Sequence, residues 1–268
     1  MTDPIQHSLS GSGGNLVFWV WANETPTFVA LIAHGYAEHA RRYDHVAERL
    51  VSAGAVVYAP DHTGHGLSEG ERALVENGEG MTADLHLVAE IAKGAHPDLP
   101  VALIGHSMGG LIATRYAQTH GSELDALVLS GPVIGGNPEI QGLLALDPIP
   151  EVPIDVAVLS RDPAVGAAYT ADPLVYSGPF KRETLESLFA AMDRVDEGPG
   201  FGELPTLWIH GSDDGLAPIQ YTRKAMEHLR GSRTEEKVYE GARHEIFNET
   251  NQDEVLDDTV EFLHRALS

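Results

Sequence analysis

The chain has 268 residues, 43% hydrophobic and 21% charged, a composition that predicts one soluble globular protein rather than a disordered or fibrous one. Its 40 acidic and 17 basic residues give a formal charge of −23, which repels phosphate backbones and argues against nucleic acid as a partner. The absence of cysteine excludes a disulfide framework and a thiolate nucleophile.

Nothing in the sequence predicts export or membrane insertion. Residues 1–15 are polar and lack the basic and apolar regions of a secretory signal. Apolar runs stay shorter than the roughly 18 residues of a membrane helix. We therefore expect a cytoplasmic protein, and the sequence makes no prediction of its oligomeric state.

Apolar runs rich in Val, Ile and Leu alternate along the chain with segments of helical period. Strands are predicted at 15–21, 27–34, 55–60, 101–105, 125–130, 206–210 and 236–239, and helices at 43–53, 82–95, 108–120, 219–230 and 254–267. This alternation is typical of an α/β protein in which helices cover both faces of a mostly parallel sheet.

Residues 134–202 interrupt the alternation with prolines and short helix-like pieces. Because so long a stretch is not a plain loop in a compact domain, we predict a cap inserted over a core formed by 1–133 and 203–268. Apolar cap residues such as Ile140, Leu143 and Leu144 can line a pocket or touch lipid, or they can form the core of the cap itself.

The segment Gly105-His106-Ser107-Met108-Gly109 has the form G-x-S-x-G and lies between a predicted strand and a predicted helix. Strand, sharp turn and helix in that order make the nucleophile elbow of the α/β-hydrolase fold. The glycines suit a turn that passes close to neighbouring backbone. Ser107 is therefore the predicted nucleophile.

A serine hydroxyl needs a base, and the base needs an acid that fixes its tautomer. In this fold the acid and then the histidine follow the serine along the chain. His244 lies in a loop after a predicted strand and is the predicted base. Asp213 and Asp214 both follow the strand at 206–210, and the residues alone leave the acid open between them.

Ester hydrolysis passes through an oxyanion, which this fold stabilises with two backbone N–H groups. One comes from the residue after the nucleophile, here Met108. The other comes from the loop after the third strand, where Tyr36 follows His34 and Gly35.

Five segments together resemble the monoacylglycerol lipases of the serine α/β-hydrolases, especially a bacterial branch. They read HGYAEH with the following Arg42-Tyr43, DHTGHGLS, GHSMGG, GSDDGLAP and GARHEIFNE, at 34–43, 61–68, 105–110, 211–218 and 241–249. The likeness extends from about residue 17 to residue 267.

The resemblance implies roles for several residues. It implies the same nucleophile, base and oxyanion donors, and its pattern G-x-x-D-x-x-x-P selects Asp214 as the acid. It also suggests that Glu38 and Arg42 form an ion pair behind the oxyanion loop, rather than a solvated pair on a helix surface. Thr63 departs from the family, because many relatives carry arginine there, which puts loop anchoring and fine specificity in doubt rather than hydrolysis.

His62 and His65 could suggest a metal pair, but the acidic ligands and spacing of a metal site are missing, and a loop role is predicted instead. We expect no cofactor and no metal.

The expected function is hydrolysis of monoacylglycerols through an acyl-enzyme on Ser107, with at most transient contact between the cap and lipid surfaces. The alternatives are a broader carboxylesterase, a lysophospholipase or, more remotely, a non-catalytic binding module with the same fold.

Overall fold

A central eight-stranded sheet organises the protein in this computed structural model, which describes residues 3–151 and 154–268. The strands are β1 (Ile5–Gly11), β2 (Gly14–Trp21), β3 (Phe28–Ala33), β4 (Ala55–Pro60), β5 (Val101–His106), β6 (Ala126–Ser130), β7 (Thr206–Gly211) and β8 (Thr234–Tyr239). Positions 1, 2, 152 and 153 of the predicted core and cap ranges lie outside the described residues.

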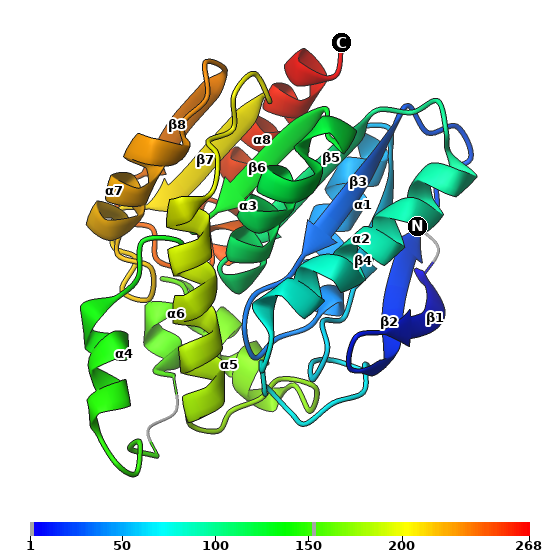
Figure 1. Cartoon of the computed structure of the whole chain (residues 1–268). Helices are drawn as coiled ribbons and strands as arrows, with labels where there is room; N and C mark the ends of the chain where they lie inside the picture. The colour runs from blue at the N-terminus through cyan, green and yellow to red at the C-terminus, as the bar shows by residue number, and fades with distance from the viewer. Residues whose placement is uncertain (1–2, 152–153) are drawn as a thin grey trace.

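The strands follow the order β1-β2-β4-β3-β5-β6-β7-β8 (Figure 1). The pairs β1–β2 and β2–β4 are antiparallel, and every pair from β4 to β8 is parallel. Every residue of β3, β4, β5, β6 and β7 is buried, which explains why these strands read as continuous apolar runs. The predicted α/β-hydrolase fold is confirmed.

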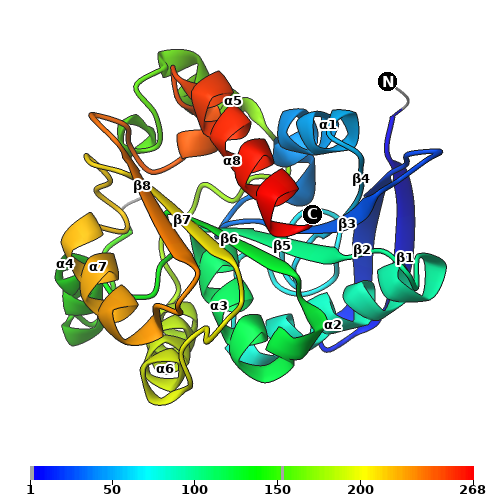
Figure 2. The same cartoon turned by 90° about the horizontal axis from the view of Figure 1, so that it is seen from above.

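Helices cover both faces of the sheet, as Figure 2 shows. Helices α1 (Asp44–Ser52) and α8 (Gln252–Ala266) pack on one face. Helices α2 (Gly78–Ala95), α3 (Met108–His120) and α7 (Ile219–Leu229) pack on the other. The parallel strands therefore sit between two apolar layers and end together at one edge.

The structure adds one strand that the sequence did not predict. Residues of β1 pair with β2 as a hairpin, although most of the strand is exposed. Because neither face of β1 is buried, it lacks the alternation that would have identified it. Helix α2 also begins earlier than predicted, at Gly78, where the Asn77 side chain caps it by accepting a hydrogen bond from Glu79 N.

The chain between β6 and β7 forms α4 (Pro138–Gly142), α5 (Pro163–Ala171) and α6 (Arg182–Glu197). Figure 1 shows α4, α5 and the beginning of α6 beyond the edge at which the parallel strands end. Leu188 and Val195 of α6 join the same apolar cluster as α2 and α3, whereas Leu159, Tyr169 and Val175 form a small cluster of their own. Part of this segment is thus built into the main core.

No helix among the described residues combines the length and the apolar character needed to cross a membrane.

Glycine is required where α3 crosses β3. A Cβ on Gly109 would collide with the carbonyl oxygen of Ala33, whereas a Cβ on Gly94, in the last turn of α2, would meet nothing within 4 Å. The same substitution in two helices therefore has opposite consequences.

We expect Gly109→Ala to lower the melting temperature, because β3 and α3 must separate to accommodate the methyl group. Gly94→Ala, the matched control, should stabilise the protein by about 0.5–1 kcal/mol because alanine favours the helix. Thermal unfolding followed by circular dichroism measures both, and equal melting temperatures for the two variants would contradict the close approach of α3 to β3.

Candidate active site

Ser107 stands at the sharp turn between β5 and α3. Its backbone has φ 55° and ψ −119°, a conformation that L-residues rarely adopt. The Ser107 N–H donates to Ser130 O at 3.0 Å, and Val133 N donates to Ser107 O at 3.1 Å, so the neighbouring β6 end holds the turn. Ser107 at this turn lines a cavity.

The structure brings together Ser107, His244 and Asp214 from three separate loops. The distance from Ser107 Oγ to His244 Nε2 is 2.8 Å, and the distance from His244 Nδ1 to Asp214 Oδ2 is also 2.8 Å. Asp213 is exposed, and its carboxylate contacts only its neighbour Ser212 in the described residues. Asp214, not Asp213, thus reaches the imidazole.

Two backbone donors hold the other oxygen of Asp214. Leu216 N and Ala217 N donate to Oδ1 at 2.9 and 2.8 Å. Burial alone would raise the pKa of Asp214, but the neighbouring His244 and the hydrogen bonds hold it well below its usual range. The carboxylate is therefore ionised and fixed in orientation.

Two buried histidines meet beside the nucleophile, and their pKa values shift in opposite directions. Burial alone would lower the pKa of His244, but the charge of Asp214 and its hydrogen bond raise it above 6.5. The His106 ring lies 4.8 Å from the His244 ring, and burial with repulsion from His244 lowers the pKa of His106 to about 3. Of these two rings, only His244 can gain a proton near neutral pH.

The two predicted oxyanion donors flank the nucleophile. Met108 is the first residue of α3, so its N–H has no acceptor within the helix. Tyr36 follows Gly35, whose Cα lies so close that a Cβ there would be 3.2 Å from Ser107 Cβ. Both residues line the cavity that Ser107 opens into.

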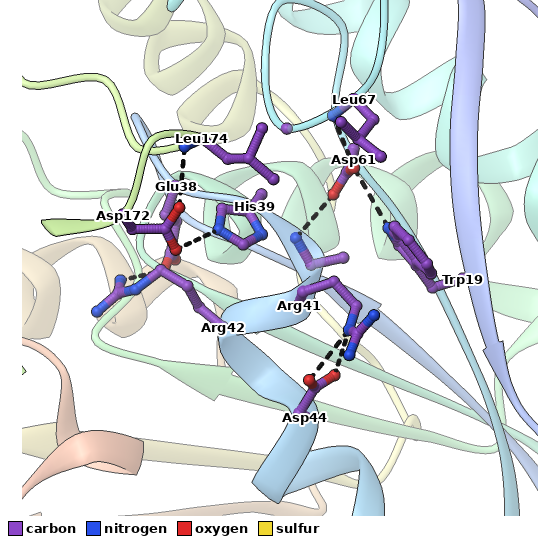
Figure 3. Close-up of polar contacts among 12 residues, drawn as sticks. Trp19, Glu38, His39, Arg41, Arg42, Asp44, Asp61, Leu67, Asp172 and Leu174 are labelled. Atoms are coloured by element: carbon purple, nitrogen blue, oxygen red, sulfur yellow. Dashed lines mark hydrogen bonds and ion pairs between the residues drawn. The ribbon is translucent and has the colours of Figure 1, made fainter. Parts of the chain in front are cut away.

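A buried charge network lies behind this loop (Figure 3). Arg42 Nη1 lies 2.5 Å from Glu38 Oε2, and the exposed fractions of the two side chains are 10% and 4%. Glu38 Oε1 accepts from Gly35 N and from the Tyr43 hydroxyl, both at 2.6 Å. The pair suggested by the family resemblance therefore exists, and it is buried rather than solvated.

Arg42 also binds Glu245, a residue that the sequence analysis did not single out. Its two terminal nitrogens each lie 2.8 Å from a Glu245 oxygen. Burial alone would raise the pKa of Glu245, but Arg42 lowers it. Because Glu245 follows His244, one guanidinium joins the oxyanion loop to the histidine loop. The acid next to the predicted base was the signal that could have identified it.

Backbone hydrogen bonds tie both loops to the chain between β6 and β7. Glu245 N donates to Leu159 O at 2.7 Å, and Tyr176 N donates to Ala37 O at 2.8 Å. His39 Nε2 lies 2.8 Å from Asp172 Oδ2, a contact drawn as a dashed line in Figure 3. Residues 156–176 are thus fixed against the active-site loops.

The loop at 61–68 is anchored by Asp61 (Figure 3). The Asp61 carboxylate accepts from Ala40 N and Leu67 N at 2.9 Å each and from the Trp19 indole at 3.3 Å. Thr63 donates its hydroxyl to Asp84 Oδ2 on α2 at 3.0 Å. Both residues therefore attach the loop to the core.

His62 and His65 are buried beside His34, and no acidic ligand joins them in the described chain to form a metal group. The described residues contain one possible group of metal ligands, formed by His86, Glu90 and Glu123 at the surface of α2 and the end of α3. Lys93 Nζ lies 3.2 Å from Glu123 and 3.8 Å from Glu90, so a cation of the protein already contacts both carboxylates.

Ser107 and His244 line a cavity with an empty volume of about 780 Å³, part of it open to solvent. Its remaining walls are mostly apolar and come largely from the chain between β6 and β7. They include Ile140, Leu159, Phe180, Leu188, Phe189 and Met192. Ser107 and His244 therefore face a cavity whose apolar walls suit a hydrocarbon chain.

Comparison with known proteins gives consistent matches along the chain. A model of the family described as serine aminopeptidase, S33, matches residues 24–251. A monoacylglycerol lipase of Mycolicibacterium smegmatis is 38% identical over 96% of each chain, and the human monoglyceride lipase is 32% identical over 91% of this chain and 84% of its own. Among solved structures, a monoacylglycerol lipase of Paleococcus ferrophilus is 28% identical, with a TM-score of 0.79 over 93% of this chain and 99% of its own.

The pKa shifts predict a pH profile. If His244 is the base, it must be neutral to accept the Ser107 proton, and its raised pKa keeps it protonated to higher pH than a free histidine. We expect kcat/KM to fall with acidification through one ionisation above about 6.5. A kcat/KM that stays constant from about pH 5 to pH 8 would argue against His244.

Proposed function

The chain belongs to the serine aminopeptidase S33 family of α/β-hydrolases, and from that premise we propose that it hydrolyses monoacylglycerols to glycerol and a free fatty acid. The observation that carries the proposal is the hydrogen-bonded series Ser107–His244–Asp214 at the floor of an apolar cavity. The names of the similar lipases support the same substrate class.

The reaction we propose has two acyl-transfer steps. Ser107 Oγ attacks the ester carbonyl while His244 Nε2 takes its proton, and His244 returns that proton to the departing glycerol oxygen. Water, deprotonated by His244, then attacks the acyl-enzyme and releases the fatty acid and Ser107. Asp214 orients the imidazole and stabilises its cation.

In this proposal the N–H groups of Tyr36 and Met108 stabilise the oxyanion of each tetrahedral intermediate. Glu38 supports the oxyanion loop through Gly35 N, and Arg42 supports Glu38. In this proposal the chain supplies the nucleophile, the base, the acid and the oxyanion donors, and solvent supplies the water. A cytoplasmic location stays a prediction.

We further propose that residues 134–202 act as a cap that forms the acyl-binding wall. Their apolar side chains line the cavity over Ser107, and their segment 156–176 is bonded to the active-site loops. The exposed Leu146, in the part of the segment nearest α4, is available for transient contact with a lipid surface.

The family description names an aminopeptidase, and the cavity argues against that activity here. The substrate of an aminopeptidase has a cationic N-terminal amine, which needs a carboxylate in the pocket. The two carboxylates that line the cavity, Glu38 and Glu245, are both bound to Arg42. An apolar wall with its acids already paired favours an uncharged ester over a cationic peptide end.

Substitutions in the proposed triad test the mechanism. Ser107→Ala or His244→Ala should lower kcat by roughly four to six orders of magnitude with the fold intact. Asp214→Asn should cost on the order of a thousandfold because the imidazole takes the wrong tautomer, and the adjacent Asp213→Asn should cost less than about tenfold. Steady-state kinetics on a short soluble ester measures all four, and a greater loss in Asp213→Asn than in Asp214→Asn would overturn the choice of acid.

A substrate panel tests the lipid class. In this proposal the cap admits one acyl chain with a small alcohol, whereas a triacylglycerol must bring two further chains past it. We expect monoacylglycerols of medium or long chain to be cleaved at least about tenfold faster in kcat/KM than matching triacylglycerols, a ratio that needs about 1.4 kcal/mol.

The other outcomes of the panel identify the alternatives. Equal rates on long-chain triacylglycerols would contradict the monoacylglycerol proposal. Activity confined to short soluble esters would indicate a carboxylesterase, and faster cleavage of lysophospholipids than of monoacylglycerols would indicate a lysophospholipase.

A further inference from the structure

A second buried histidine, His210, lies beside the proposed catalytic acid and has no part in the mechanism above. It belongs to β7, and its side chain is fully buried. Trp208, two residues earlier, lies on the same face of the strand, because side chains alternate along a strand. The Trp208 and His210 rings meet edge to face, with centroids 5.6 Å apart.

The indole of Trp208 fixes the tautomer of His210. Its Nε1 lies 3.0 Å from His210 Nδ1. An indole N–H can only donate, so Nδ1 must carry a lone pair, and the proton of the neutral ring is on Nε2. The surroundings of Nε2 agree, since it lies 2.7 Å from Ala217 O and 3.3 Å from Asp214 Oδ2, which are both acceptors.

This proton acts on both oxygens of Asp214. The backbone carbonyl of Ala217 accepts from His210, and the backbone N–H of the same residue donates to Asp214 Oδ1 at 2.8 Å. Oδ2, which lies 3.3 Å from His210 Nε2, is the oxygen that binds His244 Nδ1 at 2.8 Å. The His210 ring therefore fixes the turn at Ala217, which holds Asp214 Oδ1. It also lies near Oδ2, where its N–H offsets part of the negative charge.

We propose that His210, held as its Nε2–H tautomer by Trp208, is a positioning residue that orients Asp214 and limits how strongly its charge stabilises the protonated His244. The inference rests on the proposed function, because it assigns a role through Asp214 and His244. It extends the series of polar contacts that begins at Ser107 by two residues, because His210 contacts Asp214 and Trp208 donates to His210.

The neutrality of His210 matters because a cation there would compete with His244 for the same carboxylate. Trp208 occupies the position at which a second proton would bind. The contact of Trp208 Nε1 with Nδ1 needs the lone pair of that nitrogen.

Few ionisable groups face the proposed acid and base. Asp214 is faced by His210 and His244. His244 is faced by Asp214, Glu245 and Glu38, and His106 lies against its ring. The effect of substituting His210 on the proposed base can therefore be measured as a shift of the acid limb in the pH profile of kcat/KM.

The tautomer can be measured without activity. In Ser107→Ala protein with ¹⁵N-labelled histidine, NMR should show His210 protonated at Nε2 and unprotonated at Nδ1. In the same background, Trp208→Phe should change the Nδ1 resonance, because the hydrogen bond from the indole is lost. A proton on His210 Nδ1 in the parent protein would overturn the inference.

Kinetics tests the effect on the reaction. His210→Leu should lower kcat by about tenfold, with little change in KM, because Asp214 loses its orientation. Its acid limb should move to higher pH, because the unshared charge of Asp214 stabilises protonated His244 more strongly. His210→Gln keeps an N–H at the Nε2 position and should recover most of the loss.

Ile209→Val is the matched control, a buried change in the same strand that alters no hydrogen bond and should leave the pH profile unchanged. A His210→Leu enzyme with a kcat within about twofold of the parent and the same acid limb would overturn the inference. Equal loss of kcat in the Leu and Gln variants would overturn it as well.

The outcomes separate this inference from the proposed function. If Ser107→Ala is inactive and His210→Leu is normal, only this inference fails. If Ser107→Ala is active, the proposed function fails. If His210→Leu does not fold, the NMR tautomer and the kinetics of Trp208→Phe decide.

Discussion

The rest of the active site depends on the strained turn at Ser107. A non-glycine residue at φ 55° and ψ −119° costs on the order of 1–3 kcal/mol, and it persists because the surrounding structure over-determines it. The turn lies between the buried centre of β5 and the close crossing of α3 over β3, where Gly105 and Gly109 leave no space for a side chain. This conformation of the turn leaves Ser107 Oγ within hydrogen-bond distance of His244 Nε2.

A single buried cation organises what faces that turn. In a chain with formal charge −23, Arg42 sits between two buried carboxylates and thereby joins the oxyanion loop to the loop of His244. The same loops receive backbone hydrogen bonds from residues 156–176, so the proposed cap is anchored where it meets the chemistry. The proposed acyl wall and the proposed catalytic groups therefore belong to one connected structure.

Much of this was predictable because the determining signals are local. The apolar runs of the parallel strands and the G-x-S-x-G turn identify the fold and Ser107 without any long-range information. The choice of Asp214 over Asp213 depended on family resemblance, since the direction of a side chain leaving a strand is set by tertiary contacts. The partners of Glu245 and His210, which are Arg42 and Trp208, are identifiable only when the loops and rings are placed in space. For Glu245, the position next to the predicted base was the one local signal. Strand β1 was missed because it is exposed on both faces.

The central claim is that Ser107 is the nucleophile activated by its place in this structure. Mass spectrometry of the protein after treatment with a fluorophosphonate tests it most directly, because the reagent bonds covalently to activated serines. The account predicts one adduct, on the peptide that contains Ser107, and none in Ser107→Ala or in folded His244→Ala under the same brief exposure. An unlabelled parent protein, or an adduct that persists on another serine in Ser107→Ala, would contradict it.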